Sequence, residues 1–435
     1  MTEFQCVILN TTLYVLLFVF CFVRYKLLNL STIISAFYAV SSLASLLLYL
    51  NPLYLGSISG RYGEVELGGV IYLFVAYLLI ILSFRKFSLR NVNYLSNYND
   101  KVLRNIELFL AIVFTISLAF SLPEAVQHFF SGQSLGDLRE DSYSLENRKS
   151  SFFLIDLLGR AFGSCSLVMF VIACVRMMLL DKKSKLDTYA IIVYLLIKFE
   201  TILAVISRAT IIYTLIEIII VFAVLFYYIS RRLRRRIIIW GFLVLPFVIS
   251  IFSSISQSRF DSTSTSILED YNTLRYLGEG QLNFEAVEYP YLKQPWWGFT
   301  QFSLYRRILG LDYDDGQKRD GSDVTSFYIS KKYGYSYPVY IFYTAVGNWY
   351  QSFGKYLTMI FAVLFFIMMN RLKMKRVSFM RLLVIIILGS YFAKGIFFAD
   401  YQNEAGNLLL IYLFILNWVL RRRGKTIKIV SERKY

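Results

Sequence analysis

The stretch LGGVIYLFVAYLLIILSF, residues 67–84, decides the fold class of this chain, and Arg85 and Lys86 follow it directly. It contains no charged residue, and an apolar run of ~20 residues is long enough to cross the ~30 Å hydrocarbon core of a bilayer. In lipid such a run must satisfy its peptide hydrogen bonds internally, which only a helix achieves within one segment. The stretch therefore predicts a membrane-spanning helix.

Comparable runs recur along the whole chain, which is 57% hydrophobic and only 17% charged. A soluble domain carries about 25% charged residues, so we predict an all-α polytopic membrane protein with about 11 transmembrane helices. The ninth span is long, and Gly347, Gly354 and Lys355 interrupt it. The predicted spans are 4–23, 31–55, 67–84, 106–126, 151–180, 188–207, 209–230, 237–256, 337–370, 380–399 and 406–420.

Basic residues cluster in alternate loops and thereby predict the orientation. The first span has no basic segment before it and is followed by Arg24 and Lys26, so we expect an anchor with the N-terminus outside and the C-terminus in the cytoplasm. The net charge of +17 lies in these loops, where it favours contact with membrane lipids rather than nucleic acid. The remaining clusters are Arg85–Arg104, Lys182–Lys185, RRLRRR (231–236), RLKMKR (371–376) and RRRGK (421–425).

Four regions follow from the spans. A transmembrane bundle over 1–256 holds the first eight spans, and 337–420 holds the last three. Between them lies a large extracytoplasmic loop, 257–336, which is too long to be a mere connector and which we expect to act as a lid, because loops of this kind commonly carry function. Residues 421–435 form a basic cytoplasmic tail.

Arginines at the outer membrane surface are the first candidates for a functional site. Arg208 lies in the tight turn SRAT (207–210), and Arg259 lies at the outer end of the eighth span. Arginine binds phosphate through a planar fork of donors, although a snorkelling interface anchor is an equally good interpretation. Arg275 in the large loop and Arg160 in the fifth span, one helical turn from Asp156, extend this set.

A proton acceptor and sugar-stacking rings are the next candidates. His128, the only histidine, has an ordinary pKa of about 6.5 that suits a general base. Charged residues within spans six and seven (Lys198, Glu200, Glu217) are either pairs that lock the bundle or substrate contacts. Trp296 and Trp297 could stack on sugar rings or belong to an interfacial aromatic belt. The carboxylates that compete with His128 are Glu279, Glu285, Asp323 and Glu404.

The chain lacks several motifs of cofactor and metal chemistry. It has no GxxxxGK[ST] loop and no HExxH, and His and Cys residues form no metal-ligand cluster in the sequence. The outer loop SISGRYGEVE (57–66) lacks the acidic pair of metal-dependent transferases that use lipid-phosphate sugars. We therefore expect neither a metal nor a cofactor.

Three stretches resemble the bacterial oligosaccharide repeat-unit polymerases, the O-antigen and capsular polymerases of the Wzy type. These are ISRATIIYTLIE (206–217), ISQSRF (255–260) and VYIFYTAVGNWYQSFGKYLTM (339–359). In the last stretch, relatives have an acidic residue just before Phe-Gly where this chain has Gln351 and Ser352. The resemblance implies a fold similar to the GT-C-like fold of lipid-linked glycan polymerases and ligases, in the bacterial cytoplasmic (inner) membrane.

The resemblance also implies a reaction. Such enzymes transfer a growing glycan from undecaprenyl pyrophosphate to the nonreducing end of a new lipid-linked repeat unit. Arg208, Arg259 and Arg160, with Arg275, would bind the pyrophosphate, and His128 or a loop carboxylate such as Glu279 or Glu285 would deprotonate the acceptor. Trp296 and Trp297 would contact the glycan. Undecaprenyl-pyrophosphate-linked oligosaccharides are the implied partners, with a chain-length regulator and a flippase as further ones.

Two alternatives stay open. An O-antigen ligase shares this architecture but transfers the finished glycan to a lipid A core. A lipid-linked oligosaccharide flippase or another transporter belongs to a different class and has little use for the large loop 257–336.

Overall fold

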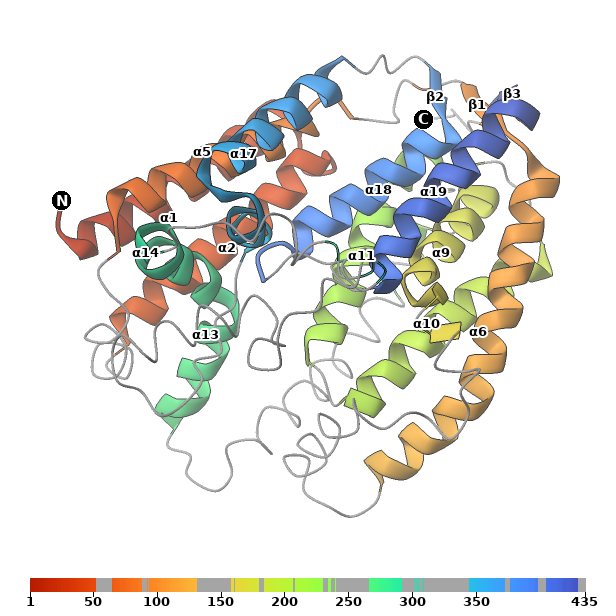
Figure 1. Cartoon of the computed structure of the whole chain (residues 1–435), viewed down its shortest axis with the longest axis horizontal. Helices are drawn as coiled ribbons and strands as arrows, with labels where there is room; N and C mark the ends of the chain where they lie inside the picture. The colour runs from red at the N-terminus through yellow and green to blue at the C-terminus, as the bar shows by residue number, and fades with distance from the viewer. Residues whose placement is uncertain are drawn as a thin grey trace. The chain divides into compact units, whose positions relative to one another are not determined.

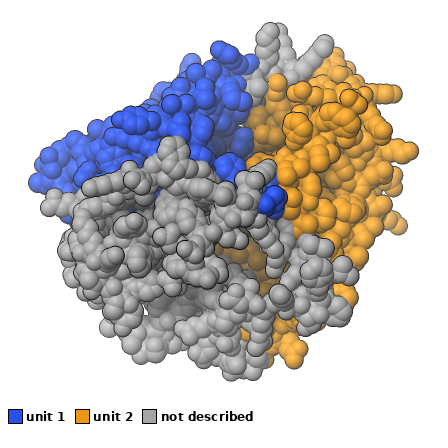
Figure 2. Space-filling model, viewed as in Figure 1, with its two compact units in different colours: residues 1–87, 265–372, 388–407 blue, residues 88–264, 373–387, 408–435 orange. Residues whose placement is uncertain are grey.

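The computed structural model, drawn as a ribbon in Figure 1, consists of two compact units, which Figure 2 shows in blue and orange. Unit 1 comprises residues 1–87, 265–372 and 388–407, and unit 2 comprises 88–264, 373–387 and 408–435. The residues that the structure describes are 1–51, 65–87, 92, 94–130, 158–159, 161–179, 184–205, 208–229, 234–235, 239, 266–291, 302, 304, 308, 344–371, 376–397 and 404–428.

Unit 1 is built on three helices from the N-terminal part of the chain. The helices α1 and α2 form a closely packed pair, and α5 contacts both of them. Two later helices complete the unit, because α13 packs against α2 and α17 packs against α5. Their bounds are α1 Glu3–Tyr25, α2 Leu30–Leu50, α5 Leu67–Ser83, α13 Ser266–Asn283, η5 Phe284–Glu288, α14 Tyr289–Tyr291 and α17 Ala345–Asn370.

Local sequence explains where these helices begin and break. Thr2 and Gln5 form a capping box at the start of α1, and the Asn29 side chain accepts a hydrogen bond from the Ser31 amide at the start of α2. Such caps satisfy amide groups that the first turn leaves without partners. Within α17, Gly354 has φ 74° and divides the helix, a conformation that glycine adopts without steric cost. The interruption predicted for the ninth span is thus present at Gly354.

Unit 2 is a second helical bundle. The helix α10 packs against α6 and α9, and α11 contacts α10. The helix α18, Phe379–Lys394, begins among the residues of unit 2 and ends among those of unit 1. The helix α19, Glu404–Arg423, begins among the residues of unit 1 and continues in unit 2. The other elements are α6 Asp100–Phe129, η2 Gly163–Cys165, α9 Ser166–Cys174, η3 Val175–Leu179, α10 Lys185–Val205, α11 Arg208–Leu225 and η4 Phe226–Tyr228.

A small sheet in unit 2 joins three segments that are far apart in the sequence. The central strand β1, Tyr94–Tyr98, pairs in parallel with β2, Arg376–Ser378, and antiparallel with β3, Lys425–Lys428. Leu95 is buried in β1 and lies opposite Val377 and Ile427. All three strands lie in or beside basic clusters that the sequence predicts on the cytoplasmic side, so the pairing agrees with that prediction.

The helices confirm a membrane-embedded, mostly helical protein. Among the described residues, six helices are long and apolar enough to cross a membrane, and two shorter apolar helices cover Leu67–Ser83 and Gly163–Met178. Most predicted spans coincide with observed helices to within a few residues, whereas 237–256 lies almost wholly outside the described residues. The total of eleven spans, the GT-C-like fold and the orientation of the termini remain predictions. The six helices are Glu3–Tyr25, Leu30–Leu50, Asp100–Phe129, Ala209–Tyr228, Ala345–Asn370 and Ala405–Arg423.

Candidate functional site

The predicted outer loop 257–336 contains a polar helix that is buried in unit 1. Glu279, Gln281, Asn283 and Glu285 are all buried in α13 and η5, although these elements are not among the helices apolar enough to cross a membrane. Charged side chains are almost never fully buried unless they are paired, and burying an amide side chain costs free energy unless it is hydrogen-bonded. The α13–η5 segment is therefore the candidate functional site of this unit.

Small residues let α13 approach α2 closely. The Ser45 hydroxyl donates a hydrogen bond of 2.7 Å to the Gly278 carbonyl oxygen, and the Ser41 hydroxyl donates one of 2.8 Å to that of Leu277. A Cβ atom on Gly278 would lie 2.4 Å from the Ser45 backbone nitrogen. Only glycine permits this crossing, which sets how close to α2 the polar side chains of α13 are held.

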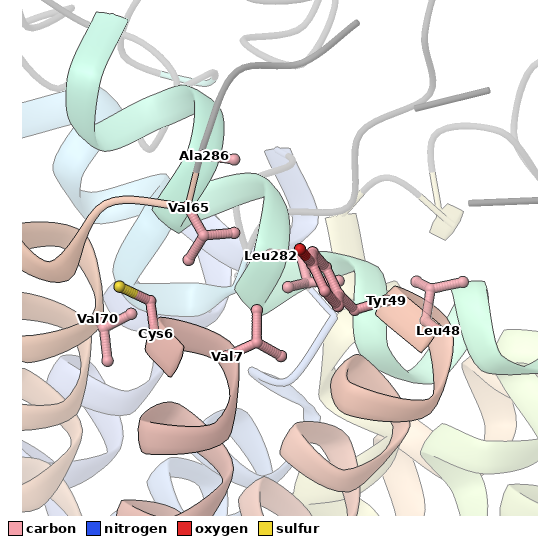
Figure 3. Close-up of a cluster of buried hydrophobic side chains, with 8 residues drawn as sticks. All are labelled: Cys6, Val7, Leu48, Tyr49, Val65, Val70, Leu282 and Ala286. Carbon is pink, nitrogen blue, oxygen red and sulfur yellow. The ribbon is translucent and has the colours of Figure 1, made fainter. Parts of the chain in front are cut away.

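An apolar cluster secures the other end of the segment (Figure 3). Leu282 and Ala286 of the α13–η5 segment pack among side chains from the first turns of α1, the last turn of α2 and the start of α5. These positions lie near the helix ends that the sequence predicts on the outer side. The other members of the cluster are Cys6, Val7, Leu48, Tyr49, Val65 and Val70.

Two of the predicted site residues form an ion pair on α13. The Arg275 guanidinium donates to the Glu279 carboxylate through Nε at 2.9 Å and Nη2 at 3.2 Å. Burial raises the pKa of Glu279, and Arg275 partly offsets this effect. An anion that bound Arg275 would therefore compete with Glu279 for the same guanidinium group.

Glu285 lies at the point where α13 passes into the π-helix η5. Its backbone approaches α5 closely, because a Cβ atom on Gly69 would lie 3.0 Å from the Glu285 Cα, and the Glu66 amide donates to its carbonyl oxygen at 3.3 Å. The carboxylate is fully buried, and neither oxygen has a hydrogen-bond partner among the described residues. Burial raises the pKa of Glu285 well above its ordinary value near 4.5.

This raised pKa predicts a pH dependence of stability. Between the unfolded and folded pKa values the native state binds more protons than the unfolded state, so the free energy of unfolding falls as pH rises above about 4.5. With choline as the only buffer cation, we expect the melting temperature of the detergent-solubilised protein to decrease from pH 5 to pH 8. Glu285→Gln should weaken this decrease, and an unchanged slope in the variant would contradict the assignment to Glu285.

An aromatic group lies beside η5 at the break in α17. The rings of Tyr72, Phe284, Tyr289 and Tyr350 contact one another, with centroid distances between 5.3 and 6.2 Å. Lys355, next to Gly354, donates a hydrogen bond of 2.8 Å to the Tyr289 hydroxyl. The sequence indicated Gly354 and Lys355 only as an interruption, and no periodic pattern links them to Tyr289.

The other predicted site residues are placed as follows. His128 is half-buried at the end of α6 in unit 2, whereas Arg275, Glu279 and Glu285 belong to unit 1. Arg208 is the first residue of α11, but its side chain lies outside the described part of the structure. The predictions that fall outside the described residues altogether concern Arg160, Arg259, Trp296, Trp297 and Asp323.

Unit 2 contains a buried ionic cluster that was not predicted from the sequence. Arg176 is 3% exposed and contacts three acidic residues: Nε lies 2.7 Å from Asp187 and 3.4 Å from Glu107, and Nη1 lies 2.7 Å from Asp100. An arginine within the apolar run before residue 180, with an aspartate shortly after it, was the available signal. The cluster ties η3 to the starts of α6 and α10.

The predicted intramembrane charges form a second network in unit 2. Lys198 lies 3.0 Å from the Glu217 carboxylate, to which the Tyr194 hydroxyl also donates. This arrangement agrees with the interpretation of a pair that locks α10 to α11. Among the described residues, no three His, Cys, Asp or Glu side chains gather in a way that could hold a metal ion.

Similarity to known proteins does not assign this site. Comparison of the chain with protein-family models, with curated proteins and with solved structures finds no match.

Proposed function

We propose that this membrane protein polymerises lipid-linked oligosaccharide repeat units on the outer face of the bacterial cytoplasmic membrane. The observation that carries the proposal is the ion pair of the half-buried Arg275 with the buried Glu279 on α13, beside the ends of α1, α2 and α5 that the sequence predicts on the outer side. A transferase needs a cation to stabilise the leaving pyrophosphate and a base to accept the acceptor proton, and this pair supplies one of each.

The chemistry requires little beyond positioning. The bond between the anomeric carbon of the growing glycan and the pyrophosphate oxygen breaks, and a bond from that carbon to the acceptor hydroxyl oxygen forms. The acceptor proton passes to a protein base, and undecaprenyl pyrophosphate leaves with the bonding electrons. Holding two substrates in line and stabilising the departing charge are the largest contributions that the protein can make.

Arg275 and Glu279 can divide these tasks. An arriving pyrophosphate would draw the Arg275 guanidinium away from Glu279, because arginine binds phosphate as it binds carboxylate, through a bidentate fork. Glu279 would lose its cation, and its burial-raised pKa makes it a better proton acceptor near neutral pH. Arg208, Arg259 and Arg160 would add to the pyrophosphate site, His128 is the alternative base, and Trp296 and Trp297 would hold the glycan.

The test is complementation of a gene deletion in the host. The wild-type gene should restore a ladder of surface glycan on a gel, whereas Arg275→Ala, Glu279→Gln, Arg208→Ala and Arg259→Ala should give only the single-repeat band at normal protein levels. Arg421→Ala, at the exposed cytoplasmic end of α19, serves as the matched control and should restore the ladder.

Other outcomes would contradict the proposal in distinct ways. If the deletion strain accumulates polymer on the lipid carrier and none of it is transferred to the lipid A core, the protein is a ligase. Repeat units that accumulate on the cytoplasmic face indicate a flippase, and an unchanged glycan removes the transferase assignment.

A further inference from the structure

On α1 and η5 of unit 1, four buried oxygen atoms have no hydrogen-bond partner among the described residues. They are both carboxylate oxygens of Glu285, the side-chain carbonyl oxygen of Asn10 and the hydroxyl of Tyr14. All three residues are fully buried. Leaving one polar group in this state costs about 1–3 kcal/mol, and more for a charged group, so four such atoms together point to something that they bind.

A hydrogen bond and an electrostatic interaction place these residues at the contact between α1 and the α13–η5 segment. Asn10 and Tyr14 are four residues apart on α1, which is about one helical turn, and Gln281 of α13 and Glu285 of η5 are likewise four residues apart. The Asn10 amide nitrogen donates to the Gln281 side-chain oxygen at 2.9 Å, which turns the Asn10 oxygen away from Gln281. Glu285 interacts electrostatically with both Tyr14 and Cys6, so its carboxylate lies beside this stretch of α1.

The chemistry of the four atoms limits what they can bind. All are oxygen atoms that can coordinate a cation, and none is hydrogen-bonded to another. A proton on Glu285 would therefore leave the Asn10 oxygen without a donor. A cation that is coordinated by several oxygens at once satisfies all of them, and hard cations prefer carboxylate, carbonyl and hydroxyl ligands.

Charge then selects the class of cation. Glu285 supplies one negative charge, and among the described residues no basic side chain contributes to its electrostatics. A monovalent ion balances one carboxylate, whereas a divalent ion would leave a buried positive charge. We propose that Glu285, Asn10 and Tyr14 form a binding site for a monovalent metal cation, sodium, which fastens the α13–η5 segment to α1.

The site has a direct consequence for the position of α13. An ion shared between Glu285 on η5 and two residues of α1 stabilises the docked segment by the free energy of binding. This inference does not depend on the transferase reaction, because it rests on residues other than Arg275 and Glu279.

The experiment uses the full chain in detergent at pH 7.5. The melting temperature is measured as sodium chloride replaces choline chloride at constant ionic strength, and ²²Na⁺ binding is measured by equilibrium dialysis. We expect the melting temperature to rise with sodium concentration and about one sodium ion to bind per chain. Glu285→Gln, which keeps the shape of the side chain, should abolish both effects.

Two further variants make the test specific. Asn10→Ala should raise the half-effective sodium concentration about tenfold, the equivalent of one lost polar ligand. Glu279→Gln alters a buried carboxylate on the adjoining helix α13. This carboxylate already has Arg275 as its cation, so the variant should retain the sodium response.

Three results would overturn the proposal. One is a melting temperature that is the same in sodium and in choline, with no bound ²²Na⁺. Another is a sodium response that survives in Glu285→Gln. The third is a dependence on pH without any dependence on sodium, which would assign a proton to Glu285 instead.

Discussion

Gly278→Val should abolish surface-glycan polymerisation and destabilise the protein by roughly 2–5 kcal/mol. The Cβ atom of valine would lie 2.4 Å from the Ser45 backbone nitrogen and 2.5 Å from the Ala44 carbonyl carbon. Backbone atoms of a packed helix cannot move aside as the end of a flexible side chain can, so α13 must shift away from α2. The hydrogen bonds from Ser45 and Ser41 to α13 would be lost with that shift.

Two control variants separate the clash from its consequences. Ser45→Ala removes one hydrogen bond without adding an atom and should cost about 1 kcal/mol while keeping the glycan ladder. Gly159→Ala adds the same kind of atom where a Cβ would meet nothing described within 4 Å, and it should be neutral. Thermal unfolding in detergent and the ladder are the readouts, and a wild-type ladder in Gly278→Val would show that the docking of α13 is dispensable.

Arg176→Leu should destabilise unit 2 by about 3–5 kcal/mol, the range for breaking a buried ion pair. The substitution removes the cation of Arg176, which contacts Asp100, Glu107 and Asp187, two of which are fully buried. Their carboxylates would then need to take up protons or water, and the starts of α6 and α10 would separate. We expect loss of monodispersity on size exclusion and a lower melting temperature.

The buried carboxylates that are left without a cation, rather than lost packing, should explain the loss of stability in Arg176→Leu. Adding Glu107→Gln and Asp187→Asn to Arg176→Leu removes the two buried acids with little change of shape, so the triple variant should recover most of the lost stability. Arg421→Leu makes the same replacement at an exposed position and should change little. A single Arg176→Leu variant as stable as the wild type would show that the cluster contributes nothing.

The membrane helices could be predicted from the sequence because one physical constraint dominates them. A bilayer requires long apolar helices, and the predicted spans 67–84 and 209–230 correspond closely to α5 and α11. Alternating basic clusters also predicted which segments share a side, and the sheet of β1, β2 and β3 joins three such segments.

The helix α13 could not be predicted by the same reasoning. Its residues are polar, so a search for apolar runs passes over them, and the segment is instead part of the predicted loop 257–336. What buries it is the contact of Gly278 with Ser45 and the hydrogen bond between Asn10 and Gln281. These are pairings between distant segments, and neither leaves a periodic signal in the sequence.

The candidate site was predictable by residue type but not by arrangement. Glu279, Glu285 and Arg275 were selected as charged residues of the large loop, and the structure buries both carboxylates. That Glu279 has a cation partner and Glu285 has none among the described residues follows only from their packing. The Arg176 cluster was missed because its members belong to separate helices.

Polymerisation in a purified system tests the central proposal most directly. Lipid-linked repeat units extracted from the deletion host are incubated with the purified chain in nanodiscs, without nucleotide, and the products are analysed by mass spectrometry. We expect lipid-linked dimers and longer oligomers together with free undecaprenyl pyrophosphate, and neither with Glu279→Gln. Repeat units that remain unchanged with the folded wild-type protein would contradict the proposed polymerase activity.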